Sequence, residues 1–199
     1  MAITNGYCSL SEVKSALRIV DSLDDSLLEM AVESASRLID GYAGRYFYNG
    51  GSAVKLFAAA DKHIVFTEDL QSVSKFETDS AADGSFTEWT STQYQLEPLN
   101  GQADGISVPY SNIRAIDAYT LPSYQGQALI RVTGVWGWSA VPVTVRQACV
   151  IQASRIFKRL DSPLGVAGFG DMGLVRVGTR LDPDVEHLVA PYRMMRNLA

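Results

Sequence analysis

The residues with the most recognisable chemical spacing are GFGDMG at positions 168–173, which match the pattern G-x-G-x-x-G. In dinucleotide-binding proteins such a run follows a strand and opens a helix, so that the phosphates meet the positive end of that helix. Here a predicted helix precedes the run and an extended segment follows it. We therefore interpret the run as a loop and predict no cofactor.

Histidines, carboxylates and nucleophiles do not converge in a catalytic or metal-binding pattern. The only histidines, His63 and His187, have no cysteine or carboxylate at ligand spacing. Asp182, Asp184 and Glu186 cluster at a predicted helix start, where the helix dipole favours negative charge. There is no G-x-S-x-G elbow, although a dispersed Ser-His-Asp triad stays open on sequence alone. We predict no catalytic residue and no metal ligand, and hence a protein that is not an enzyme.

Trp89, Trp136 and Trp138 could form a stacking platform for single-stranded nucleic acid or a sugar surface. The alternative is the core of a β domain with aromatic side chains at its rim. Residues 61–140 carry 4 Lys and Arg against 10 Asp and Glu. Because phosphate binding needs basic neighbours, the core interpretation is favoured.

Charge is unevenly distributed along the 199 residues, whose net charge of −5 argues against a nucleic-acid coat. In residues 141–199, 8 Lys and Arg stand against 5 Asp and Glu. These basic residues either contact a partner or form a solvated face, and the sequence does not separate the two. The positions concerned are Arg155, Lys158, Arg159, Arg176 and Arg180.

The two cysteines, Cys8 and Cys149, are far apart and outside any C-x-x-C pattern. Both lie in apolar helical segments, so buried free thiols are favoured over a disulfide. The first residues lack the basic and apolar regions of a signal peptide. No apolar run reaches the ~18 residues of a membrane span, so we expect synthesis in the cytoplasm and no membrane partner.

Two helices are predicted at the start of the chain. Ser9 and Glu12 fit a capping box that begins a short helix ending near Arg18. A long helix follows, with Asp24 as its expected N-cap. Its apolar residues recur at helical spacing and predict one buried stripe. That stripe consists of Leu27, Leu28, Ala31, Ala35, Leu38, Ile39 and Tyr42.

After residue 51 the pattern changes to short apolar runs separated by turn pairs such as Asn100-Gly101. This spacing is typical of an antiparallel sandwich or a small barrel. The expected strands cover residues 54–57, 63–66, 73–78, 86–89, 94–96, 113–119 and 128–138. In the last of these, the even positions are expected to lie on one face, and they are Ile130, Val132, Trp136 and Trp138.

Helical spacing returns over residues 144–160 and again after Asp182. Because the helices at the two ends need each other to bury their stripes, the β block is interpreted as an insertion. We therefore predict an α+β fold. Its helical core of about four helices comprises residues 1–51 and 141–199, and its inserted antiparallel β domain comprises residues 52–140.

Several short stretches at the two ends carry a family resemblance. They are YCSLSEVK at 7–14, DDSLL at 24–28, ASRLID at 35–40, QACVIQASRIFKRL at 147–160, SPLGV at 162–166, LDPDVE at 181–186 and PYR at 191–193. In this order they resemble the head-to-tail connector (adaptor) proteins of tailed bacteriophages. The resemblance covers both helical ends, roughly half of the chain, and the β insertion is compatible with longer members.

The resemblance implies a structural virion protein made in the host cytoplasm. Such adaptors form a homo-oligomeric ring, expected to be a dodecamer, under the portal of the DNA-filled head. The ring extends the channel through which genomic DNA passes without sequence-specific binding, and it docks a stopper or tail protein. Heterologous ring contacts require two different complementary surfaces on each subunit.

The same resemblance suggests where contacts lie. Docking on the portal is carried over to the C-terminal region, at Val185, Leu188, Val189, Tyr192, Arg193 and Arg196. Subunit contacts are expected from the glycine-rich loop, at Gly165, Phe169, Gly170 and Met172. Independently of the resemblance, the basic balance of residues 141–199 makes Arg155, Lys158 and Arg159 possible electrostatic contacts.

Two alternatives remain open. The protein could be a stopper or tail-completion connector, although such proteins are usually β-rich throughout and lack paired helical ends. It could also be a β module that binds single-stranded nucleic acid through its tryptophans.

Overall fold

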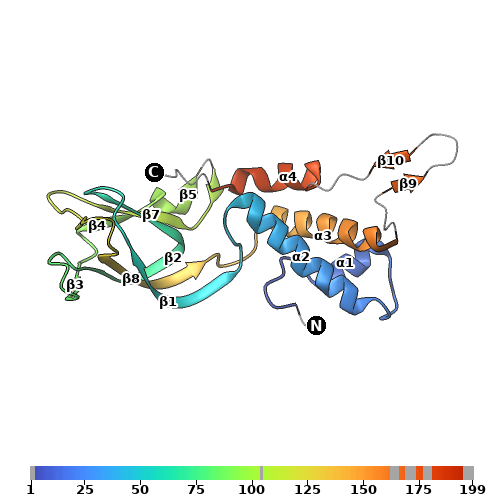
Figure 1. Cartoon of the computed structure of the whole chain (residues 1–199), viewed down its shortest axis with the longest axis horizontal. Coiled ribbons are helices and arrows are strands. Elements are labelled where there is room, and N and C mark those ends of the chain that lie inside the picture. Colours follow the sequence, from blue (N-terminus) through green and yellow to red (C-terminus); the bar gives the residue numbers. More distant parts are fainter. Residues whose placement is uncertain (1–2, 104, 162–165, 169–173, 177–180, 195–199) are drawn as a thin grey trace. The chain divides into compact units, whose positions relative to one another are not determined.

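The computed structural model describes residues 3–103, 105–161, 166–168, 174–176 and 181–194. The chain forms two compact units: a helical unit of Met1–Tyr48 with Val141–Ala199, and a β unit of Asn49–Ala140 (Figure 1). The fold is α+β with an antiparallel sheet, as the sequence predicts.

The helical unit contains the α-helices α1 (Leu10–Leu17), α2 (Asp25–Ala43), α3 (Val143–Lys158) and α4 (Pro183–Val189). The 3-10 turns η2 (Arg159–Asp161) and η4 (Ala190–Tyr192) follow α3 and α4. Strands β9 (Val166–Gly168) and β10 (Leu174–Arg176) pair antiparallel between these helices. α3 packs against α1, α2 and α4. Among the described residues, no helix is both long enough and apolar enough to cross a membrane.

Local sequence signals decide where α1 and α2 begin. At α1 the Ser9 hydroxyl accepts from the Glu12 N–H and the Glu12 carboxylate accepts from the Ser9 N–H, which confirms the capping box. At α2, Asp24 occupies the N-cap position, but its side chain makes no capping hydrogen bond. The predicted side-chain cap is therefore wrong. Asp24 has φ −102° and ψ 9°, whereas a capping side chain normally reaches the helix from extended backbone.

The face that α2 buries is narrower than the predicted stripe. Leu28, Val32 and Ile39 are fully buried, but Leu27 is 41% exposed and Leu38 is 49% exposed. Successive helical residues advance by about 100°, so Leu27 and Leu38 share one side of α2, turned away from the buried face. Placing these two leucines in the core was therefore wrong.

All four helices contribute to the core of the helical unit. Because α3 packs against the other three, apolar side chains from elements far apart in sequence are buried together. The helices contribute Val13, Leu28, Val32, Ile39, Val145, Cys149, Val185 and Val189, and the segments next to them add Tyr7, Cys8 and Phe47.

The β unit is built on one main antiparallel sheet with the order β1-β8-β2-β7-β4, and β3 pairs with the end of β2. Within the described residues β1 and β4 are its two edges, so this sheet is open rather than a closed barrel. The hairpin of β5 (Gln102–Ala103) and β6 (Ile106–Ser107) follows the turn η1 (Leu99–Gly101). The main strands are β1 (Asn49–Phe57), β2 (Ile64–Thr78), β3 (Thr87–Glu88), β4 (Tyr94–Glu97), β7 (Tyr110–Ala115) and β8 (Ile130–Gly137).

β2 is one strand of 15 residues where the sequence predicts two, at 63–66 and 73–78. It pairs with β7 from Ile64 to Leu70 and with β8 from Leu70 to Thr78. Both ladders contain register shifts, and such bulges interrupt the two-residue alternation of side chains. The bulges therefore interrupt the alternating sequence pattern without ending the strand, which is why the sequence predicts two strands instead of one.

β8 follows the predicted alternation. Its even positions, together with one tryptophan just beyond it, are buried, and they are Ile130, Val132, Trp136 and Trp138. Gly134 lies in the same row, where a Cβ atom would sit 2.4 Å from the carbonyl oxygen of Ser72. The close approach of β2 and β8 thus depends on a glycine at this position.

Candidate interaction surfaces

One exposed apolar surface lies on α2, on the side away from its buried face. Leu27, Met30 and Leu38, here called the outward row, are 41%, 51% and 49% exposed. Their spacing of three and eight residues keeps them on one side of the helix. Ser34 and Gly41 lie along the same line, and both are small and exposed. This row could contact another helix closely.

The charged residues beside the outward row are paired within α2. The Arg37 Nε donates to Asp40 at 2.8 Å, and its guanidinium lies 3.6 Å from the Glu33 carboxylate. These are i,i+3 and i,i+4 pairs on one helix. Arg37 also donates to the Asn5 carbonyl, and Glu33 accepts from the Thr4 and Asn5 N–H groups. These charges are therefore already paired within the helical unit, and an apolar contact on the row does not need to supply partners for them.

A buried polar network fixes the segment before α1 onto α2. The Tyr7 hydroxyl donates to Asp40 and accepts from the Phe47 N–H at 2.8 Å. Burial raises the pKa of Asp40, although hydrogen bonds from Tyr7 and Arg37 oppose this rise. Burial likewise raises the pKa of Tyr7. All these groups are used in internal bonds, so the network is structural.

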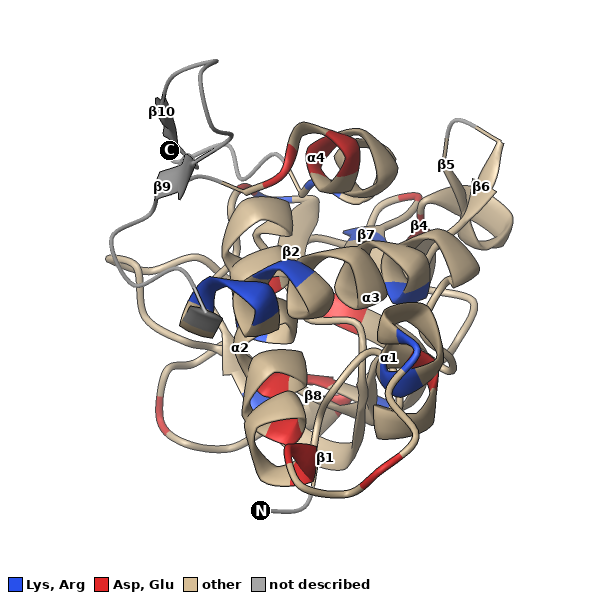
Figure 2. Cartoon of the chain, turned by 90° about the vertical axis from the view of Figure 1, so that its right-hand side faces the viewer, with Lys and Arg blue, Asp and Glu red and all other residues tan. Residues whose placement is uncertain are grey.

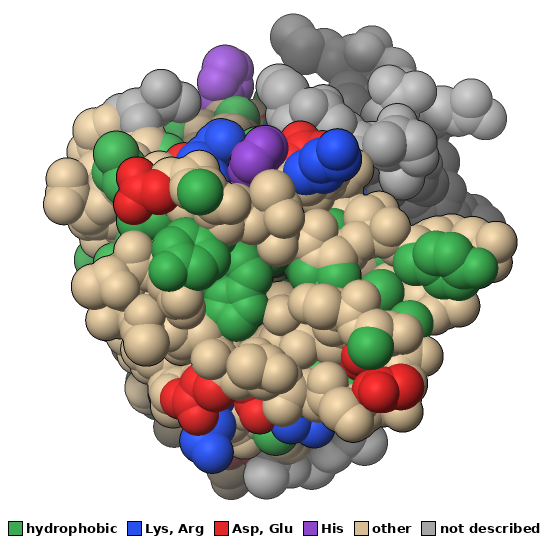
Figure 3. Space-filling model, turned by 90° about the vertical axis from the view of Figure 1, so that its left-hand side faces the viewer, with side chains coloured by type: hydrophobic (Ala, Val, Ile, Leu, Met, Phe, Trp, Pro, Cys, Tyr) green, Lys and Arg blue, Asp and Glu red, His purple; other side chains and the backbone are tan. Residues whose placement is uncertain are grey.

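A second exposed apolar surface lies on the β unit. Val54 and Leu56 on the edge strand β1 are 59% and 56% exposed, and they oppose Thr133 and Arg131 on β8. Hydrophobic side chains also interrupt the polar surface on the face of Figure 3. The exposed large apolar residues of this unit are Val54, Leu56, Phe66, Leu99, Tyr119 and Tyr124.

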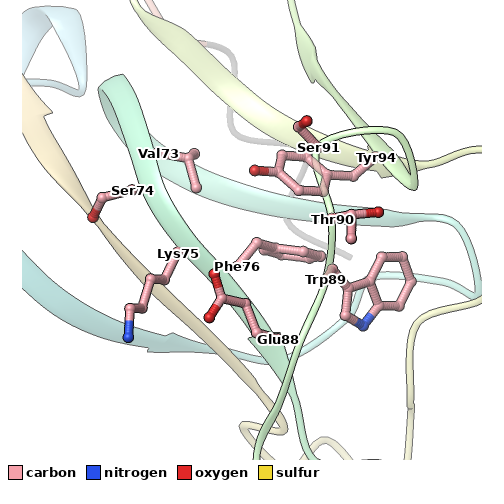
Figure 4. Close-up of a pocket in the computed structure, with 9 residues that line it drawn as sticks. All are labelled: Val73, Ser74, Lys75, Phe76, Glu88, Trp89, Thr90, Ser91 and Tyr94. Atoms are coloured by element: carbon pink, nitrogen blue, oxygen red, sulfur yellow. The ribbon is translucent and has the colours of Figure 1, made fainter.

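A cavity of about 410 Å³ lies between β2, β3 and β4 (Figure 4). Its aromatic wall is formed by Phe76, Trp89 and Tyr94, with ring centroids 5.3 Å and 4.8 Å from that of Phe76. The Trp89 Nε1 donates to the Thr78 hydroxyl at 2.8 Å, which fixes the indole against the core. Burial raises the pKa of Tyr94, and the charge of Glu88 adds to this rise.

The three tryptophans do not share an exposed face. Trp136 and Trp138 are buried at 1% and 5% exposure, and the Trp138 Nε1 donates to Asp69 at 2.8 Å. Buried indoles cannot stack on bases. The nucleic-acid interpretation therefore loses two of its three residues, and the favoured core interpretation accounts for them.

The expected electrostatic contacts are spread over different environments. Arg155 pairs with Asp182, the N-cap of α4, so it stabilises the helical unit itself. Lys158 is exposed and Arg159 is half-buried. Acidic and basic segments are interspersed over this unit rather than separated (Figure 2). The side chains of Arg176 and Arg180 lie outside the described part of the chain.

The expected portal-docking residues fall into two groups. Val185 and Val189 are fully buried and hold α4 within the helical unit, and Leu188 is half-buried. Tyr192 accepts a hydrogen bond from Thr144 at 3.2 Å and packs edge-on against Phe47. The remaining residues differ: Arg193 is exposed with its guanidinium 4.9 Å from the centre of the Tyr42 ring, and Arg196 lies outside the described residues.

The residues expected to make subunit contacts also lie outside the described part of the chain, and they are Gly165, Phe169, Gly170 and Met172. Among the residues that are described, no group of three His, Cys, Asp or Glu side chains has the arrangement of a metal site. Sequence reasoning did not identify the outward row as a surface. Met30, an apolar residue outside the predicted stripe, is the signal that would have revealed it.

Two features define the class of this protein: a helical unit with an apolar row left uncovered, and an inserted antiparallel sheet. The sequence profile of the phage gp6-like head-tail connector proteins matches residues 7–118. The chain belongs to this family, and its role is that of a structural connector of the virion.

Two solved structures resemble the whole chain. One is "Neck of empty GTA particle computed with C6 symmetry", with a TM-score of 0.58 and 19% identity over 100% of this chain and 95% of that chain. The other is "Neck of native GTA particle computed with C12 symmetry", with a TM-score of 0.57, 18% identity and the same coverage. At this identity the likeness shows a shared fold. No curated protein matches the chain.

Proposed function

We propose that this protein is the head-to-tail adaptor of a tailed phage or phage-like particle. Its copies form a ring, expected to be a dodecamer, below the portal, and the ring extends the DNA channel and docks the next connector or tail protein. Family membership supports a connector role. The two similar neck structures, computed with C6 and C12 symmetry, support a ring. Catalysis, cofactors and metals have no part in this proposal.

The observation that carries the proposal is the outward row of α2. Leu27, Met30 and Leu38 span eleven helical steps, or about 16 Å, on the surface of the helical unit. Burying such a row against another protein gains roughly 25 cal/mol for each Å² of apolar surface. A ring contact is heterologous, so its complementary surface lies elsewhere on the subunit. Val143 and Leu160, 72% and 56% exposed near the two ends of α3, are suitable members of it.

The ring is tested by replacing Leu27, Met30 and Leu38 together with glutamine, which keeps helix propensity and removes the apolar surface. We expect the wild-type protein to form rings, alone or on portal rings, and the variant to stay monomeric with unchanged helical circular dichroism. Native mass spectrometry measures the stoichiometry.

The matched control replaces Val54 and Leu56 with threonine, because these residues are more exposed than the outward row and lie on a strand. If the α2 variant still forms rings and the control variant does not, the subunit contact lies on the β unit rather than on α2. A wild-type protein that is monomeric with and without portal would overturn the ring itself.

Docking on the portal is proposed for the C-terminal region, at the residues that remain at the surface. Because Val185 and Val189 are core residues, deleting everything after Arg180 is expected to destabilise the fold. The informative variant is therefore Arg193→Glu, combined with Arg196→Glu. We expect it to fold and form rings but to lose cosedimentation with portal, and retained cosedimentation would exclude this surface.

The stopper alternative is less well supported. Stoppers are expected to be β-rich throughout, whereas this chain has a unit with four α-helices among its described residues. Electron microscopy of labelled particles would place the protein directly below the portal or further down the neck.

A further inference from the structure

The two cysteines of the chain meet in the core of the helical unit. Cys8 and Cys149 are 141 residues apart in sequence, but the Cys8 Sγ lies 3.2 Å from the Cys149 Sγ. Both are free thiols, exposed by 6% and 0% respectively. A disulfide has an S–S distance of about 2.05 Å, so joining them requires a movement of only about an ångström.

The surroundings hold this pair in place. The Cys149 Sγ lies 3.4 Å from the Ser36 hydroxyl on α2, and that hydroxyl accepts from the Tyr7 N–H at 3.0 Å. The segment before α1 therefore meets α2 and α3 at this point. The hydrogen bond between the two thiols lowers the pKa of Cys149 and raises that of Cys8. Because the Cys8 thiol donates to the Cys149 sulfur, Cys149 is the sulfur that this geometry stabilises as a thiolate, the nucleophilic form.

We propose that Cys8 and Cys149 are a covalent modification site, at which a peroxide converts the thiol pair into an intramolecular disulfide that ties the N-terminal segment to α3. The Cys149 thiolate attacks one peroxide oxygen, the O–O bond breaks and hydroxide leaves, giving a sulfenic acid. The Cys8 sulfur then attacks the Cys149 sulfur, the S–O bond breaks and water leaves. In total, two thiols and one hydrogen peroxide give one disulfide and two waters.

The cross-link would act on a unit that is discontinuous in sequence. The chain leaves the helical unit after Tyr48 and returns at Val141, so its two pieces are joined covalently only through the β unit. A Cys8–Cys149 bond adds a direct connection between them. Closing so long a loop restricts the unfolded chain, and the expected rise in the melting temperature of the helical unit is about 5–15 °C.

The experiment treats reduced, folded full-length protein with a slight excess of hydrogen peroxide. We expect the intact mass to fall by two hydrogen atoms, both free thiols to disappear under denaturing conditions, and a peptide linking Cys8 to Cys149 to appear on digestion. Dithiothreitol should reverse all three changes. The melting temperature, measured by helical circular dichroism, should rise on oxidation.

Cys8→Ser and Cys149→Ser are the matched controls, and neither should lose two hydrogen atoms or gain thermal stability on oxidation. Retention of both thiols in folded wild-type protein would overturn the proposal. So would a mass gain from separate oxygen addition to each sulfur, or cross-links found only between chains. These outcomes are all measured on the wild-type protein, so the proposal can still be tested if a serine variant fails to fold.

Discussion

The helical unit and the β unit are stabilised by different kinds of side chain. The β unit is organised around large buried aromatics, with Phe76 and Trp136 in one apolar cluster. In the helical unit, α2 and α3 bury many small residues that allow the helices to approach closely, namely Ala31, Ala35, Ala43, Ala148 and Ala153. Large side chains such as Phe47 and Leu28 are fully buried in the helical unit as well. What distinguishes the helical unit is therefore the added close packing at small residues and the Tyr7 network.

Electrostatics also differ between the two units. In the β unit, Arg131 bonds both carboxylate oxygens of Glu77, at 2.7 and 2.9 Å, and lowers its pKa. Arg114 lowers the pKa of Glu97 in the same way. In the helical unit burial raises the pKa of Asp40. Protonation in acid therefore removes stability from the β unit at Glu77 and Glu97, whereas protonation of Asp40 does not destabilise the helical unit.

The chain carries its own probes for comparing the units. Trp89, Trp136 and Trp138 all lie in the β unit, whereas the described α-helices all lie in the helical unit. Tryptophan emission therefore follows unfolding of the β unit, and helical far-UV circular dichroism follows the helical unit. Two separate cores predict two separable transitions.

The largest expected effect comes from Phe76→Ala, which empties the centre of the β-unit core. We expect the free energy of unfolding of this unit to fall by about 3–5 kcal/mol, because a large cavity replaces a buried ring. The measurement is urea denaturation followed by tryptophan emission. Phe66→Ala is the control, since Phe66 is 56% exposed. An equal shift of the helical circular dichroism would show that the units unfold together.

Gly134→Ala and Gly41→Ala make the same change in the two units with opposite expected signs. The new Cβ at residue 134 would meet the Ser72 carbonyl at 2.4 Å, which destabilises the β unit by about 1–3 kcal/mol. At residue 41, in α2, a Cβ meets no atom within 4 Å. There we expect a gain of about 0.5–1 kcal/mol, because alanine favours the helix. Thermal melts with both probes check the signs, and a stabilised β unit in Gly134→Ala would contradict the close approach.

Tyr7→Phe tests the polar network of the helical unit. It removes the acceptor of the buried Phe47 N–H and the donor to Asp40, so we expect a loss of about 1–3 kcal/mol. Tyr42→Phe is the control, because it also deletes one hydroxyl and keeps the ring beneath Arg193. Helical circular dichroism in urea measures both. Equal losses would mean that the network adds nothing specific.

Ser9→Ala and Asp24→Ala compare two helix starts within one unit. Ser9 caps α1 and should cost about 1 kcal/mol when truncated. Asp24 makes no side-chain capping bond, so its truncation should change stability by less than about 0.5 kcal/mol. Chemical denaturation of the two variants side by side measures this difference, and the reverse order would mean that Asp24 caps α2 in solution.

The smallest expected effect is a difference between the pH values at which acid unfolds the two units. Glu77 and Glu97 have lowered pKa values in the folded protein. Their contribution to the stability of the β unit is therefore full above the unfolded pKa of 4.5 and is lost as the pH falls through the folded pKa values. Asp40 has a raised pKa in the folded protein. Its contribution to the stability of the helical unit is therefore lost as the pH rises from the unfolded pKa of 3.8 through the folded pKa, and it returns in acid. The pKa of Glu12 is lowered, so its effect on the stability of the helical unit in acid has the opposite sign and partly offsets that of Asp40.

We therefore expect tryptophan emission to report acid unfolding at a higher pH than helical circular dichroism does. The double variant Glu77→Gln and Glu97→Gln should reduce the gap between the two midpoints. Coincident midpoints in the wild-type protein would contradict the difference in sign. Both measurements use one acid titration at fixed ionic strength, because exposed ion pairs are screened by salt.

The sequence by itself determined the features that depend on neighbours along the chain. The capping box of Ser9 and Glu12, the alternation in β8 and the α+β order of elements were all predicted from short spacings, and the structure confirms them. The resemblance at the two ends also led to the correct connector family. These features need only a few adjacent residues, whose propensities and periodicity act locally.

Tertiary structure alone decided which side of each element is covered. It exposed Leu27 and Leu38, placed Val185 and Val189 in the core, and brought Cys8 against Cys149. Periodicity shows that a helix has an apolar side but not how wide a sector its neighbours cover, because that depends on packing between residues distant in sequence.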